Sequence, residues 1–107
     1  MKLFSLALIL MATSATAQMA ELENMQRAME LGQIIASEKP CGLTFDQSAI
    51  SAWIDTNVPA DDMGFTSNLQ MGSMSMEMEL TSMSDSLKTA HCRAIERTAR
   101  HFGFITE

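Results

Sequence analysis

The first 17 residues have the three-part pattern of a secretory signal peptide, and this pattern limits what the rest of the chain can become. A lysine at position 2 precedes the apolar run of residues 3–11, and Ala15-Thr16-Ala17 offers the small residues that signal peptidase requires. The apolar run is too short to cross a bilayer, which takes roughly 20 residues. The sequence therefore predicts cleavage after Ala17, export to the periplasm, and no membrane insertion of the mature chain.

Two cysteines, Cys41 and Cys92, are the strongest constraint on the fold of residues 18–107. These residues, about 90 in number, suffice for a single domain, and a domain of this size commonly depends on a covalent or metal link. In an exported protein a lone cysteine pair is most simply one intrachain disulfide. Closing a loop of about 50 residues stabilises the folded state by about 4 kcal/mol in the chain-entropy model. An intermolecular bridge and a reactive thiol are the alternatives.

The spacing of apolar residues predicts an all-α bundle of four short helices. The first helix covers residues 19–37 and ends before Pro40. The second opens at the capping-box sequence of residues 44–47 and ends near Pro59, and the third has Asp61 and Asp62 in its first turn. The fourth runs from its N-cap Ser84 to about residue 102, with Gly103 as its stop. The disulfide would then tie the start of the second helix to the middle of the fourth.

Residues 70–83 are harder to assign. Within them, residues 74–80 alternate strictly between apolar and polar, which is the period of a strand. A lone strand has no partner in an otherwise helical chain, and methionine and glutamate are good helix formers. We therefore interpret residues 70–83 as the frayed end of the third helix, leading into a loop.

The same segment holds a methionine cluster within 13 residues, consisting of Met71, Met74, Met76, Met78 and Met83. One interpretation is a Cu(I) site, because thioether sulfurs are soft ligands that select this ion. A second is a surface that adapts to different apolar protein partners, kept soluble by Glu77 and Glu79. The third is ordinary packing, because methionine fills irregular gaps in apolar cores.

Titratable side chains offer one candidate switch and little catalytic chemistry. His91 lies on the apolar face of the fourth helix, where its protonation in mild acid would loosen the bundle; the alternative is a structural histidine with a satisfied hydrogen bond. Cys92 is its neighbour, but adjacent helical residues point about 100° apart, which does not suit a Cys–His catalytic pair. The chain has no metalloprotease motif, nucleophile elbow or phosphate loop, so we expect no enzymatic activity.

Charge argues against two classes of partner. The formal net charge is −6, with the acidic excess in residues 18–87 and a modest basic excess in residues 88–107. Nucleic acids and anionic membranes attract basic surfaces, so neither is expected as a partner.

Three segments carry a resemblance to a known group of proteins. Residues 39–46 (KPCGLTFD), 61–65 (DDMGF) and 88–92 (KTAHC) resemble short exported alphaproteobacterial proteins without an established activity, some of which carry the label "signal recognition particle". The similarity covers roughly residues 38–105. The sequence does not support that label, because it has a secretion signal, an acidic charge, no GTP-binding loop and no basic RNA-binding stripe.

A weaker, architectural likeness is to the acid-activated periplasmic chaperones of the HdeA type. Those proteins are similar in export, mature length, helical fold and a single disulfide of comparable span. Shared architecture does not carry activity by itself. The sequence nevertheless favours a non-enzymatic exported protein that binds another protein or peptide, and this resemblance implies a role in stress. The alternative is a periplasmic Cu(I)-binding protein, and a homodimer is left open as the oligomeric state.

Overall fold

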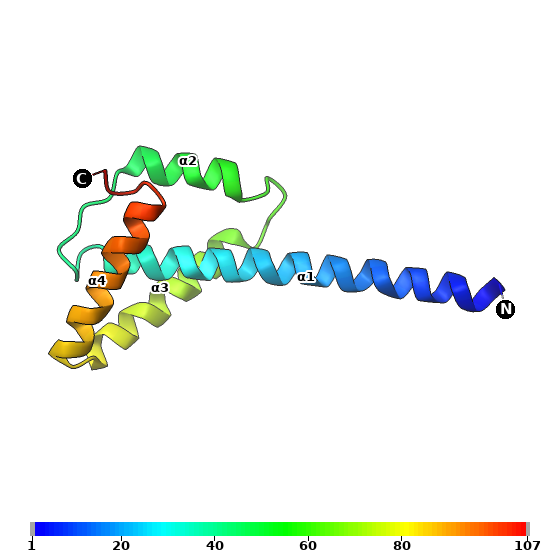
Figure 1. Cartoon of the computed structure of the whole chain (residues 1–107), viewed down its shortest axis with the longest axis horizontal. Helices are drawn as coiled ribbons and strands as arrows, with labels where there is room; N and C mark the ends of the chain where they lie inside the picture. Colours follow the sequence, from blue (N-terminus) through cyan, green and yellow to red (C-terminus); the bar gives the residue numbers. More distant parts are fainter. Residues whose placement is uncertain (1, 107) are drawn as a thin grey trace.

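The computed structural model describes the backbone of residues 2–106 and the side chains of residues 16–106, and it confirms the all-α fold with one disulfide. Four helices follow one another along this part of the chain: α1 (Lys2–Ser37), α2 (Gln47–Asn57), α3 (Phe65–Ser82) and α4 (Asp85–His101). Figure 1 shows α2, α3 and α4 gathered around the C-terminal half of α1, while the N-terminal half of α1 extends away from them.

The first helix is longer than the sequence pattern suggested. It spans 36 residues and begins before residue 19, continuing through the expected cleavage site, and it ends at Ser37 as predicted. Cleavage after Ala17 would shorten it to a mature helix starting at Gln18. The apolar side chains that define the expected signal peptide, residues 3–11, lie outside the described side chains. No helix in the described part of the chain combines the length and the apolar character needed to cross a membrane.

The core lies where α2, α4 and the segment after α4 meet the C-terminal part of α1. Its buried cluster consists of Leu31, Ile34, Phe45, Ile50, Ile95, Ala99 and Phe104. Helical spacing predicts an inward face of α2 formed by Phe45, Ala49, Ile50, Trp53 and Ile54. This face is confirmed, because Phe45 and Ile50 are buried and the other three pack against the cluster. The sequence pattern predicts an inward face of α1 formed by Leu22, Met25, Met29, Gly32, Ile35 and Ala36. This is partly wrong, because Leu22 and Met25 are exposed, whereas Leu31 and Ile34 are buried.

The chain leaves α4 through a Schellman motif and turns back into the core. Gly103 has a φ of +83°, a left-handed conformation that favours glycine. Its N–H donates to the Arg100 carbonyl, and the Phe104 N–H donates to the Ala99 carbonyl over 2.9 Å. Phe104 is consequently fully buried, and its own carbonyl accepts a 2.9 Å hydrogen bond from the N–H of Asp46 at the start of α2. The predicted stop at Gly103 is confirmed.

Two glycines allow α1 and α3 to cross with their backbones in contact. A Cβ atom placed on Gly32 would collide with the Leu69 carbonyl oxygen and lie 2.9 Å from the Ser73 nitrogen. A Cβ atom on Gly72 would collide with the Met29 carbonyl oxygen and lie 2.7 Å from the Met29 Cα. Small residues at a crossing permit this close approach, and α1 packs against α3 more extensively than against any other helix.

Two expectations about α3 are wrong. Asp61 and Asp62 lie in the turn before the helix, where a carboxylate oxygen of Asp62 accepts a 3.2 Å hydrogen bond from the Gly64 N–H. Residues 70–82 are helical and not a frayed end or a loop. The buried side of this helix is a narrow line formed by Gly72, Met76 and Leu80. Most of its other positions face solvent whatever their polarity, so the alternation of apolar and polar residues does not indicate a strand here.

The disulfide joins Cys41 and Cys92 as predicted, with Cα atoms 5.2 Å apart. Cys41 sits in the turn between α1 and α2, and Cys92 lies in the middle of α4. The cap of α2 differs in detail from the predicted capping box, because Asp46 is the N-cap and accepts a hydrogen bond from the Ser48 N–H. Ser84 caps α4 as expected.

Candidate functional site

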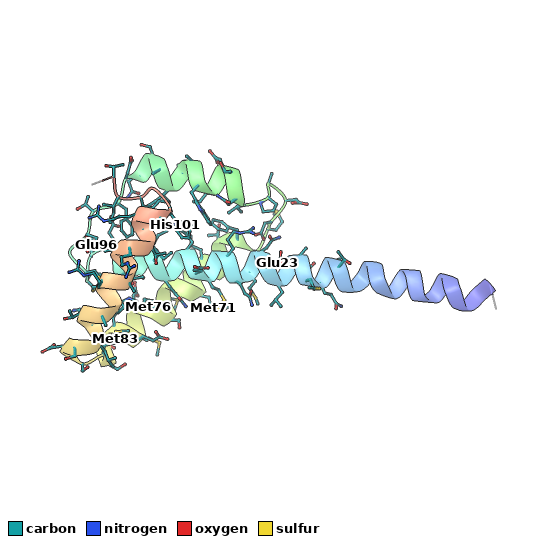
Figure 2. All side chains as sticks on the ribbon, in the orientation of Figure 1. Glu23, Met71, Met76, Met83, Glu96 and His101 are labelled. Atoms are coloured by element: carbon teal, nitrogen blue, oxygen red, sulfur yellow. A yellow bond between two sulfur atoms is a disulfide. The ribbon has the colours of Figure 1, made fainter. Side chains whose placement is uncertain are left out.

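The methionine cluster is divided between two sides of α3. Met71, Met74 and Met78 have 55%, 64% and 73% of their surface exposed, whereas Met76 is only 6% exposed. Figure 2 shows where Met71, Met76 and Met83 lie along α3 and at its end. Met83 follows the helix as its C-cap and is half-buried. Helical spacing of three and four residues brings the three exposed side chains onto one face. We call Met71, Met74 and Met78 the methionine stripe.

The methionine stripe points away from the core. At about 100° per residue, its direction is opposite to the line of Gly72, Met76 and Leu80 that packs inward. The stripe is therefore not a by-product of core packing, and the interpretation of the whole cluster as core filler is wrong for these three residues. Met76 alone fits that interpretation.

Two carboxylates border the stripe. Glu77 and Glu79 immediately precede and follow Met78, both side chains are exposed, and α3 contains no basic residue. The two ion pairs within the described residues are formed by Arg93 and Arg100 with Glu96 on α4, so neither Glu77 nor Glu79 has a cationic partner there. The outward face of α3 is thus an apolar strip with a negative edge on each side.

Further large apolar side chains are exposed elsewhere. Met19 and Leu22 are exposed on α1, Met63 is 92% exposed in the turn before α3, and Leu87 is exposed near the start of α4. Helical spacing predicts Leu87 on the inward face of α4 together with His91 and Ile95. For Leu87 this is wrong, because it is 62% exposed. The exposure of Met19 and Leu22 had no reliable sequence signal, since their helical spacing also fits a buried face.

His91 is partly buried, as expected, and its hydrogen-bond partner is a serine. The His91 Nε2 atom lies 2.9 Å from the hydroxyl of Ser37, which is fully buried. The Ser37 hydroxyl also lies 2.8 Å from the Gln33 carbonyl oxygen. This arrangement joins α1 to α4 close to the disulfide and favours the interpretation of His91 as a satisfied structural residue. His101 is exposed at the end of α4 and takes no part in it.

A surface hollow of about 520 Å³ lies beside the disulfide. Charged side chains of both signs surround it, namely Asp85, Lys88, Arg93 and Glu96, and Arg93 pairs with Glu96 at 3.7 Å. The mixture of signs gives the hollow no preference for a charged ligand.

Conventional metal ligands do not assemble in the described part of the chain. Among the residues it covers, no three side chains of histidine, cysteine, aspartate and glutamate gather at one point. The thioethers that share one exposed face are those of the methionine stripe, whereas Met76 is buried on the opposite side of α3.

One contact that the sequence did not reveal fixes the end of α2. Arg27 on α1 donates a 2.9 Å hydrogen bond to the carbonyl of Asn57, the last residue of α2. A guanidinium at a helix C-terminus satisfies an orphan carbonyl and complements the helix dipole. No sequence motif predicts a cap supplied from 30 residues away.

Comparison of the chain with protein families, with curated proteins and with solved structures finds no match.

Proposed function

We propose that this chain is an exported, non-enzymatic protein that binds apolar segments of other proteins or peptides and protects them from aggregation. The observation that carries the proposal is the methionine stripe, which places three large apolar side chains in water on the side of α3 facing away from the core. Exposed apolar surface of this kind is characteristic of interaction sites.

Methionine is well suited to such a role. Its unbranched side chain and polarisable sulfur adapt to irregular apolar surfaces, which is why methionines recur at binding sites that accept many partners. Helix α3 is also firmly anchored behind the stripe by its crossing with α1 at Gly32 and Gly72. A rigid backbone that presents adaptable side chains favours binding of varied clients.

Export to the periplasm belongs to the same proposal. It is supported by the N-terminal signal pattern and by the disulfide, which persists in oxidising compartments. Expression with the native N-terminal segment, followed by fractionation and intact-mass measurement, tests it directly. A periplasmic product beginning at Gln18 is expected, and a cytoplasmic product of full length would contradict export.

Client protection is tested with three forms of the purified chain. Light scattering of an aggregating client protein is followed between pH 3 and pH 7 with the parent chain, with the triple variant Met71→Gln/Met74→Gln/Met78→Gln, and with Met63→Gln. Glutamine keeps helix propensity and length while removing apolar character. We expect the triple variant to lose most of the protection and Met63→Gln to retain it, since Met63 lies outside the stripe. Absence of protection by the parent chain at every pH would contradict the proposal.

Cu(I) binding is a second candidate function, favoured by the fact that Met71, Met74 and Met78 share one exposed face at helical spacing. Three thioethers can form a soft ligand set. The triple variant Met71→Leu/Met74→Leu/Met78→Leu separates the two functions, because it removes the sulfur atoms and keeps the apolar surface. Competition for Cu(I) against a chromogenic chelator should be lost in this variant if copper is the ligand. Client protection should be retained if apolar binding is the function.

A further inference from the structure

We propose that the segments bound by the methionine stripe are cationic and amphipathic, with apolar side chains flanked by lysine or arginine. This inference rests on the proposed function and names its class of partner. It follows from the positions of Glu77 and Glu79 on α3 and from the absence of lysine and arginine in that helix.

The geometry places one carboxylate on each side of the stripe. Successive residues of an α-helix turn by about 100°, so Glu77 and Glu79 project to opposite sides of Met78. Both side chains are exposed, and the remaining exposed positions around the stripe are serine, threonine and glutamine. A partner whose apolar side chains lie on the methionines would therefore meet a negative charge at both edges of the contact.

The charges are free to attract such a partner. Neither Glu77 nor Glu79 forms an ion pair within the described residues, and α3 carries no lysine or arginine. The chain as a whole has a net charge of −6, which adds a long-range attraction for cations. Complementary charge at the rim of an apolar contact accelerates association and selects among partners.

The same charges disfavour a second copy of this chain as the occupant. Two copies joined stripe to stripe would bring Glu77 and Glu79 of one chain against the same carboxylates of the other. Like charges facing each other across an interface oppose its formation. A cationic apolar segment satisfies both the methionines and the carboxylates, whereas a homodimer through this face satisfies only the methionines.

Three synthetic peptides test the preference. The first has leucine and phenylalanine at alternating positions with lysine flanks, the second has the same apolar residues with glutamate flanks, and the third has the lysines without the apolar residues. Binding of each to the purified chain is measured by fluorescence anisotropy at low and high salt. We expect the first peptide to bind at least about tenfold more tightly than either of the others, with the advantage reduced by salt because exposed charges are screened.

Matched charge variants locate the effect. Glu77→Gln/Glu79→Gln should reduce the preference for lysine over glutamate flanks to about threefold or less. Glu21→Gln/Glu23→Gln on α1 removes the same charge at the same spacing and should leave the preference nearly unchanged. An equal loss in both variants would overturn the assignment, because it would show an effect of net charge alone.

The remaining outcomes separate this inference from the proposed function. Equal binding of the lysine-flanked and glutamate-flanked peptides, lost from both in Met71→Gln/Met74→Gln/Met78→Gln, would overturn the cationic preference and leave apolar binding intact. Tight binding of the lysine peptide that lacks apolar residues would overturn the role of the stripe. A dimer in sedimentation that dissociates in the methionine variant would assign the face to a second copy. Failure of every peptide to bind, together with absence of client protection, would remove both proposals.

Discussion

The Ser37 hydroxyl and the His91 imidazole form a buried link between α1 and α4, with Oγ and Nε2 2.9 Å apart. The Gln33 carbonyl can only accept a hydrogen bond, so the single hydroxyl proton of Ser37 satisfies it. His91 then donates its Nε2–H to the serine oxygen. This accounting assigns the Nε2-protonated form of the ring and leaves no buried polar atom of the pair without a partner.

Loss of the Ser37 hydroxyl should destabilise the domain. Ser37→Ala leaves the His91 Nε2–H without an acceptor, which costs about 1–2 kcal/mol in the free energy of unfolding. Urea denaturation of Ser37→Ala, His91→Ala and the double variant measures the coupling, which we expect to be about 1 kcal/mol. Thr89→Ala removes an exposed hydroxyl that bonds only within α4, and it should change stability by less than about 0.5 kcal/mol. Strict additivity of the Ser37 and His91 effects would show that the two residues do not interact.

Alanine at either glycine of the α1–α3 crossing should be strongly destabilising. Helix propensity favours alanine over glycine by about 1 kcal/mol, so a wider crossing would make Gly32→Ala or Gly72→Ala stabilising. The close backbones predict the opposite sign, with a loss of about 3 kcal/mol, because backbone atoms cannot move aside as a flexible side chain can. Thermal and urea unfolding measure whether each alanine variant is more or less stable than the parent.

Gly64→Ala is the matched control for the crossing. A Cβ atom there would meet the Asn68 amide at 3.3 Å and an Asp62 carboxylate oxygen at 3.8 Å, both of them ends of side chains, and Gly64 has a negative φ. The free energy of unfolding of Gly64→Ala should differ from that of the parent by less than about 1 kcal/mol. A similar loss at Gly32, Gly72 and Gly64 would contradict the close crossing.

Removal of the disulfide should cost about 2–5 kcal/mol. In Cys41→Ser/Cys92→Ser the unlinked denatured chain regains the freedom of a loop spanning 51 residues, while the folded contacts change little. Non-reducing mass spectrometry of the parent establishes the linkage, and chemical unfolding compares the two proteins. Two free thiols in the parent, or equal stability of the variant, would contradict the role of the bond.

Phe104 should be as important to stability as any residue within a helix. It is fully buried, and its ring contacts Phe45, Trp53 and Phe102 with centroid separations of 6.0, 6.5 and 5.7 Å. Phe104→Ala should lower the free energy of unfolding by about 3–5 kcal/mol. Thr106→Ala, two residues later and exposed, should be neutral within about 0.5 kcal/mol. Near-equal stability of the two variants would show that the segment after α4 is not part of the core.

The features that could be predicted from the sequence are those that depend on local residue chemistry. The disulfide partners, the N-cap at Ser84 and the stop at Gly103 each depend on residue types with few structural alternatives. The inward face of α2 followed from a clear helical period.

The incorrect predictions share a physical cause: each depends on which other segment of the chain packs against the residues concerned, and local sequence does not specify that segment. Residues 70–82 alternate in polarity, and their helix is stable because Gly72 meets α1 at a crossing between positions 40 residues apart in the chain. Leu22, Met25 and Leu87 have helical spacing, yet they lie outside the buried core and remain 49%, 36% and 62% exposed. The five clustered methionines are equivalent in the sequence. In the structure Met76 differs from the methionine stripe because its side chain is buried whereas those of the stripe are exposed.

The burial of Phe104 also determines when folding of the core can be completed. Its backbone pairs with Asp46 and its ring completes the aromatic group around Trp53, so the core cannot close until the chain is made almost to the end of its described part. A polypeptide that crosses a membrane through a narrow channel must remain unfolded until it has passed. For a chain exported as proposed above, this topology would delay folding, because within the described residues the segment that closes the core follows every helix that it joins.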